Sequence, residues 1–168
     1  MKLILKIQII IIFLFGCTGY SQQYKNQKIS KSFEIEKGIV NGNDLSEFLS
    51  EKHARIVFYK ESKNSDLMMA NFWQKDNSQS FGKAKIIKHE HEVINDEVFE
   101  SDTYFIKWKF KNTYNDKKGV AKIKLKIHYT TKGNYVQITI IPKDCEVLIY
   151  KGYEVDNTGI ARLLKKEL

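Results

Sequence analysis

Strict alternation of apolar and charged side chains in the middle of the chain constrains the fold more than any other feature. In the segments 104–111 and 121–127 every second residue is apolar, and lysines fill most of the positions between. The apolar members are Tyr104, Ile106, Trp108 and Phe110 in the first segment and Ala121, Ile123, Leu125 and Ile127 in the second. Because successive side chains of a strand point to opposite faces, this period of two predicts an antiparallel hairpin with one core face and one solvated face.

The same kind of segment recurs along most of the chain. Apolar or β-branched runs predict strands at residues 32–40, 54–59, 67–74, 81–93, 104–112, 120–129, 135–141 and 147–155. The stretches between the later strands, such as 115–119 and 131–134, are short and rich in residues typical of turns. A parallel return needs a crossover of about a dozen residues or more, so these short connections predict that neighbouring strands run antiparallel.

Together these patterns predict an all-β fold: a single antiparallel up-and-down meander of about eight strands. Closure into a barrel would remove the exposed edge strands, and a strongly curved open sheet covered by a helix is the alternative. Asp44 and Glu47 have the spacing of a capping box and predict one short helix over residues 44–52. Ile160, Leu163 and Leu164 predict a short helical tail that docks on the sheet.

The N-terminal segment has the three-part pattern of a signal peptide. Lys2 and Lys6 are followed by an apolar run from Ile9 to Phe15 and then by small or polar residues. The run has seven residues, whereas a helix that spans a membrane needs about 20. The sequence therefore predicts export to the periplasm, the cell envelope or the outside of the cell.

Two routes of processing are open. Gly19 and Ser21 place small residues at the third and first positions before a cut at Gln22, which would release residues 22–168. The segment Leu14-Phe15-Gly16-Cys17 resembles a bacterial lipobox. This resemblance to lipoproteins implies removal of residues 1–16, lipidation of Cys17 and a domain tethered to a membrane by acyl chains.

After removal of residues 1–21 the chain is one basic domain. The whole chain has 28 Lys and Arg against 20 Asp and Glu, and loss of Lys2 and Lys6 leaves 26 − 20 = +6. Residues 22–31 are polar and predict a flexible lead-in to a single domain at 32–168. Under either route Cys145 is the one remaining thiol, flanked by Asp144 and Glu146, and we expect it to be unreactive.

Lysines on the solvated face of the central hairpin are a candidate contact surface. The six are Lys107, Lys109, Lys111, Lys122, Lys124 and Lys126. Arginine, which recognises bases and phosphates through a fork of donors, occurs only at Arg55 and Arg162, so we expect no binding of nucleic acid. Contact with another protein or with an anionic polymer or membrane remains open, as does a face that only keeps the sheet soluble.

His89 and His91 stand two residues apart, which places both imidazoles on one face of a strand. Such a pair can contribute to a metal site, but a site needs a third ligand and the sequence shows none at a suitable spacing. We therefore predict no metal site and no cofactor.

No catalytic motif is present, and the protein is not expected to be an enzyme. Nucleophile elbows, phosphate-binding glycine loops and zinc-protease helices are all missing. Carboxylates such as Glu97 and Glu100 fall in a segment, 97–102, that is predicted to be a wet loop, where a raised pKa is not expected.

Binding is therefore the predicted activity. An eight-stranded barrel either fills its interior with side chains or holds one small ligand. The large aromatics Trp73, Trp108 and Phe110 are the residues expected to line such a cavity, with aromatic core filling as the alternative. The first hypothesis is an exported carrier of a small apolar ligand, and the second is an envelope protein that contacts a partner through its lysine-rich face or its loops.

Overall fold

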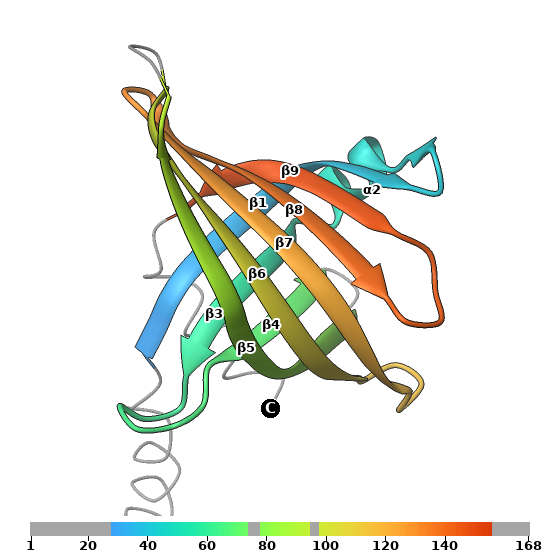
Figure 1. Cartoon of the computed structure of the whole chain (residues 1–168). Helices are drawn as coiled ribbons and strands as arrows, with labels where there is room; N and C mark the ends of the chain where they lie inside the picture. The colour runs from blue at the N-terminus through green and yellow to red at the C-terminus, as the bar shows by residue number, and fades with distance from the viewer. Residues whose placement is uncertain (1–27, 74–77, 95–97, 156–168) are drawn as a thin grey trace, which may run out of the picture.

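The computed structural model describes residues 28–73, 78–94 and 98–155. The predicted signal peptide, Cys17 and the predicted C-terminal helical tail lie outside the described residues. Figure 1 shows the arrangement of the strands, with long β5, β6 and β7 crossing the front and β1 and β3 behind them. The bounds are β1 Lys28–Val40, β2 Asn43–Asp44, α2 Ser46–Glu51, β3 Ala54–Lys60, β4 Met68–Trp73, β5 Ser78–Val93, β6 Val98–Asn112, β7 Lys118–Thr130, β8 Gly133–Pro142 and β9 Leu148–Glu154.

The strands form a closed antiparallel barrel. Their order is β1-β3-β4-β5-β6-β7-β8-β9, β9 pairs again with β1, and β2 adds two residues to the edge of β1. Every neighbouring pair is antiparallel, from Phe33 opposite Ile56 between β1 and β3 to Val40 opposite Leu148 between β1 and β9. The all-β meander of about eight strands is thus confirmed, and between the two predicted closures it is the barrel that forms.

Alternation separates a dry interior from a wet outer face. Inward residues of the central hairpin, such as Ile106, Ile123 and Ile127, are at most 3% exposed, whereas Lys107 and Lys122 between them are exposed. A second apolar cluster lies on the opposite face of β3 and β4, where the buried residues are Val57, Tyr59, Ala70 and Phe72. Most of the barrel therefore has one apolar face, while β3 and β4 are apolar on both.

Three local predictions need correction. α2 begins at Ser46 and its N-cap is Leu45, whose side chain makes no capping hydrogen bond; Asp44 instead ends β2, and its carboxylate accepts hydrogen bonds from Ser46. Residues 98–102, predicted to be part of a wet loop, belong to β6, where Ser101 is fully buried. β1 begins at Lys28, four residues before the predicted strand.

Within the described part of the chain, no helix combines the length and the apolar character that crossing a membrane would require.

The seam between β1 and β9 closes the barrel, and it depends on a glycine. A Cβ added to Gly152 would lie 1.8 Å from the carbonyl oxygen of Glu34 on β1. We expect Gly152→Ala to lower the free energy of unfolding by about 3 kcal/mol, because the two backbones would have to separate. Urea denaturation would measure the change, with Lys151→Ala, an exposed neighbour on the same strand, as the matched control. Equal stability of the two variants would contradict a closed seam.

Candidate functional site: a cavity in the barrel and its polar mouth

The barrel interior is not completely filled. A cavity of about 500 Å³ lies inside it, lined by inward side chains from β3, β5, β6 and β7. Its apolar lining consists of Phe58, Leu67, Ala84, Ile86, Ile106, Leu125 and Ile127. Ile86 remains 46% exposed although it shares the inner face with Ala84, so the cavity opens to solvent beside β5. Pockets for small molecules have this size and this mainly apolar character.

Polar side chains surround the opening. Tyr104, Lys31, Lys60 and Lys85 contribute to the cavity wall. Lys31 is ion-paired with Glu154 at 2.7 Å, and the other carboxylate oxygen of Glu154 accepts a hydrogen bond from Asn134. Lys60 is half-buried and forms no ion pair with any described acid. We use the name polar mouth for these residues together with the histidine cluster described next. The residues are Tyr104, Lys31, Glu154, Asn134 and Lys60.

A β-bulge in β5 turns two histidines toward the mouth. The register with β6 shifts between Ile86 and Lys88, so that His89 lies opposite Tyr104 and His91 opposite Asp102. Without the shift, odd-numbered residues of β5 would share the outer face with Lys85. The bulge instead places both imidazoles on the face that carries Ala84 and Ile86.

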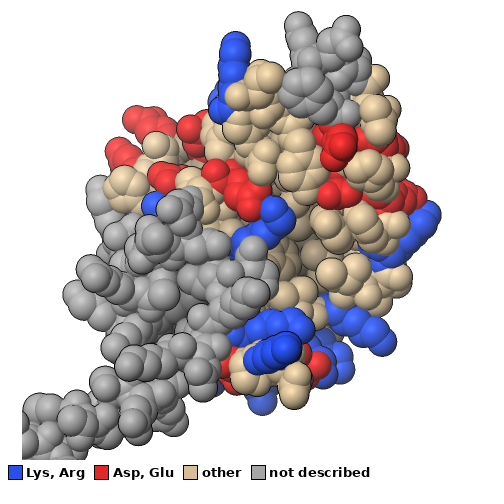
Figure 2. Space-filling model, turned by 90° about the vertical axis from the view of Figure 1, so that its left-hand side faces the viewer, with Lys and Arg blue, Asp and Glu red and all other residues tan. Residues whose placement is uncertain are grey.

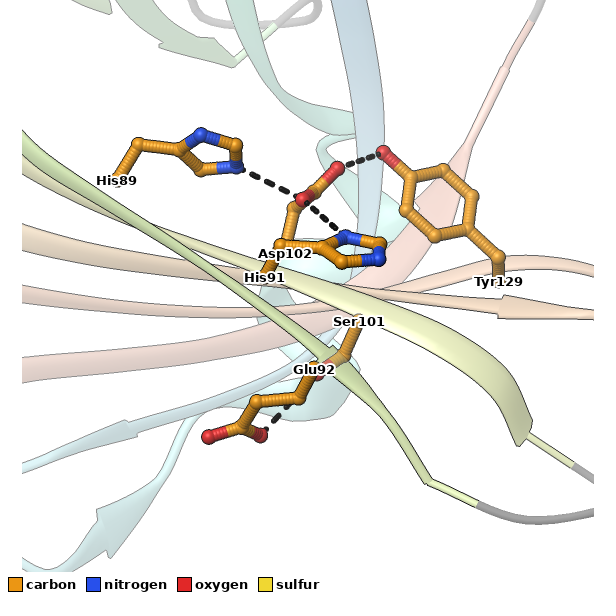
Figure 3. Close-up of polar contacts among 6 residues, drawn as sticks. All are labelled: His89, His91, Glu92, Ser101, Asp102 and Tyr129. Carbon is orange, nitrogen blue, oxygen red and sulfur yellow. Dashed lines mark hydrogen bonds and ion pairs between the residues drawn. The ribbon is translucent and has the colours of Figure 1, made fainter.

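Asp102 holds this cluster together (Figure 3). Its Oδ1 lies 2.7 Å from His89 Nε2 and 3.1 Å from His91 Nδ1, and its Oδ2 accepts a hydrogen bond of 2.7 Å from the Tyr129 hydroxyl. The imidazole of His89 stacks on the ring of Tyr104, with centroids 4.5 Å apart. The carboxylate is only 14% exposed, while each histidine is about half exposed. Three strands are therefore tied together around one carboxylate.

The charges at this cluster are strongly biased. Partial burial by itself would raise the pKa of Asp102, but hydrogen bonds from Tyr129, His89 and His91 outweigh it and lower the pKa to about 2. Burial and the hydrogen bond to Asp102 raise the pKa of Tyr129 well above its ordinary value, so its hydroxyl stays a donor. Since an ionised carboxylate only accepts hydrogen bonds, each histidine must present an N–H to it.

The histidine pair does not extend to a metal centre in the described structure. Among residues 28–73, 78–94 and 98–155, no group of three or more His, Cys, Asp or Glu side chains is arranged to hold a metal ion. Asp102 Oδ1 is shared by both imidazoles, and Oδ2 is taken by Tyr129. What the cluster offers a ligand is hydrogen-bonding groups: two partly exposed imidazoles and the stacked Tyr104 ring.

On the other face of the same strands, Glu92 and Ser101 meet away from the cluster (Figure 3), and Lys126 is 3.4 Å from Glu92. Figure 2 looks onto the side of the molecule where β5 extends beyond β4. Acidic side chains gather mainly in the upper part of that view and basic ones mainly in the lower part. On this side of the molecule, negative and positive side chains are therefore largely separated from one another.

The predicted aromatic residues lie outside the cavity wall. Trp108 and Phe110 point inward from β6 and pack with ring centroids 4.7 Å apart, and Trp108 is 3% exposed. Trp73, on β4, meets Phe48 of α2 edge to face at 5.2 Å. The structure therefore brings Trp108 and Phe110 together and keeps Trp73 with the helix. Cys145 is exposed in the turn between β8 and β9.

Sequence reasoning missed the residues that form the mouth. Lys31 was assigned to the lead-in, and Asp102 to a loop, although both belong to strands. A signal for Asp102 was present, because it continues the inward series of Tyr104, Ile106 and Trp108 by one more step of two. Following that alternation across the acidic residue would have placed it on the inner face.

The chain was compared with protein-family models, with curated proteins and with solved structures, and none of them matches it.

The Asp102 cluster predicts a specific dependence of stability on acid. The pKa of Asp102 is about 2 in the folded protein and about 3.9 in an unfolded chain. Its contribution is therefore present above about pH 4 and is lost as the pH falls to about 2. Asp102→Asn should lower the free energy of unfolding at about pH 7, and the gap to the wild-type protein should shrink toward about pH 2.

Urea denaturation at several pH values measures this gap. Glu100→Gln is the matched control, because Glu100 is an exposed carboxylate on the same strand, and it should leave stability nearly unchanged. A gap between wild type and Asp102→Asn that stays constant with pH would contradict the assignment.

Proposed function

We propose that this protein is an exported, non-catalytic carrier that binds one small ligand, with an apolar body and an acidic end, in the cavity of its barrel. The observation that carries the proposal is the open cavity of about 500 Å³ with an apolar wall and three lysines in its lining. Export is supported by the charged start, apolar run and small residues of positions 1–21.

The wall determines the kind of body that fits. Side chains such as Phe58, Leu125 and Ile127 offer no hydrogen bonds, so a polar body would lose its hydration without compensation. Binding of an apolar chain or ring system is favourable instead, because it removes the surface of the ligand and the exposed surface of Ile86 from water.

The mouth determines the kind of end group. Lys31 is neutralised by Glu154, and Asp102 is saturated by three donors. Lys60 and Lys85 are the charges at the cavity wall that lack a described partner of opposite sign, and of these two Lys60 is the half-buried one. A carboxylate or similar acid at the end of the ligand would supply that partner at a half-buried position, where a charge pair is worth more than at the surface.

Filling the cavity tests the proposal. The probe is cis-parinaric acid, a fluorescent polyene acid. We expect Leu125→Phe to keep the protein stable, because the cavity accepts the larger ring, and to weaken probe binding at least about tenfold. Ile140→Phe is the matched control: Ile140 is also inward and 1% exposed but is not part of the cavity wall. It should cost about 1–3 kcal/mol of stability.

A second comparison separates the two ends of the ligand. Lys60→Gln should weaken binding of the acid but leave binding of its methyl ester unchanged, whereas Leu125→Phe should weaken both. If the probe does not bind, or binds equally well to wild type and Leu125→Phe, the proposed function is wrong.

Processing decides whether the carrier diffuses or is tethered. Intact mass of the protein isolated from an exporting host is expected to match a chain that starts near Gln22. A mass that starts at Cys17 and includes acyl groups would instead support the lipoprotein route, and a mass that retains residues 1–16 would contradict both.

A further inference from the structure

The outer face of β5, β6 and β7 carries an array of lysines in register. Lys85 lies opposite Lys107, and Lys107 lies opposite Lys122, so three lysines form one row across three strands. Lys109 and Lys124 lie one step to either side of this row. All five are exposed. We call these five residues the basic face.

No described acid forms an ion pair with a lysine of the basic face, although the carboxylate of Glu90 interacts electrostatically with Lys124. The acids nearest to it are engaged elsewhere: Glu90 pairs with Lys88, Glu92 with Lys126 and Asp116 with Lys111. None of the five lysines forms an ion pair with a described residue. Like charges directly opposite each other on a sheet are destabilising, so this arrangement costs the isolated domain stability. A negatively charged partner would remove that cost.

Apolar side chains stand exposed among these lysines. Ile87, the residue at the β5 bulge, is 61% exposed, and Ile141 is 44% exposed. The ring of Phe105 lies between Lys88 and Lys124, with each ammonium less than 6 Å from the ring centre. A groove of about 750 Å³ lies here, and its lining includes Ile87, Phe105, Val120 and Ile141 together with Lys107 and Lys122.

We propose that this face docks on the surface of an anionic phospholipid bilayer. The lysines would lie among the phosphates, while Ile87 and Ile141 reach between the headgroups into the apolar boundary. The charge and the apolar side chains share one patch, which is the composition of an interfacial membrane surface rather than of a face that is only solvated. This contact goes beyond ligand binding, since it uses the outside of the barrel and the carrier function uses the inside.

A bilayer fits the patch better than an acidic protein does. The basic face has no arginine, whose planar fork gives geometric selectivity for carboxylates, and lysine acts as a point charge that accepts any nearby phosphate. Protein interfaces also depend on aromatic anchors in closed pockets, whereas the most exposed apolar residues here are the aliphatic Ile87 and Ile141. A fluid surface of dispersed phosphates needs no fixed partner geometry.

Vesicle binding tests the proposal. The protein is the processed form of a Cys17→Ser chain, so that no acyl chain contributes. We expect it to cosediment with vesicles of phosphatidylcholine containing about one third phosphatidylglycerol, and only weakly with phosphatidylcholine alone. Raising the salt from about 0.1 M to about 1 M should abolish most of the binding, because it shortens the screening length from about 10 Å to about 3 Å.

Two pairs of variants locate the contact. Lys107→Glu with Lys122→Glu should weaken binding at least about 25-fold, at about fivefold for each lysine removed. Lys63→Glu with Lys132→Glu makes the same change of net charge at exposed positions away from the face and should change binding by less than about threefold. Ile87→Ser should weaken binding several-fold, whereas Val93→Ser, at a residue that is 79% exposed on another part of β5, should have no effect.

Three results would overturn the proposal. The first is no binding to the anionic vesicles, and the second is an equal loss in the two double variants, which would show an effect of net charge alone. The third is capture by dextran sulfate without binding to vesicles, which would make the partner an anionic polymer. Binding of cis-parinaric acid should be normal in Lys107→Glu with Lys122→Glu, so failure here is distinguishable from failure of the carrier function.

Discussion

Pairing of the first strand with the last is the constraint on which the rest of this structure depends. β1 is shared: its first half pairs with β3 and its second half with β9. Only when that seam forms does the sheet have an inside, because alternation then separates apolar residues such as Ile56 and Ile138 from the solvated lysines. Gly152 permits the close approach of the two backbones. A cavity, a mouth and an outer face exist as separate surfaces because the barrel is closed.

The bulge in β5 links the two surfaces. One extra residue between Ile86 and Lys88 reverses the parity of the strand, so His89 and His91 join the inner face and Ile87 is left projecting from the outer face. The same irregularity therefore supplies hydrogen-bonding groups to the polar mouth and an apolar side chain to the basic face. Bulges commonly re-aim side chains in this way, and here one bulge serves both proposals.

Periodicity predicts the strands of this chain well, because it reports which face of each strand is dry. The alternation of Tyr104, Ile106 and Trp108 with lysines leaves only one placement for β6. Periodicity cannot predict the bulge. Ile86 and Ile87 look like an ordinary pair of apolar residues, and nothing in the pattern shows that inward and outward positions exchange after them. Periodicity does place Asp102 on the inner face, in step with Tyr104 and Ile106, but it does not contain the donors from β5 and β7 that make this position favourable for a carboxylate. The position of the polar mouth depends on the pairing of strands, which no local sequence pattern contains.

Charge balance at the mouth supports the proposed carrier function over acid–base chemistry at Asp102. A catalytic carboxylate needs a pKa near the working pH, but the donors around Asp102 hold its pKa at about 2. Glu154 is ion-paired with Lys31 and accepts a hydrogen bond from Asn134. These pairs leave Lys60 and Lys85 as the unmatched charges beside an apolar wall. Under the proposed carrier function, such a rim would distinguish ligands by their end group.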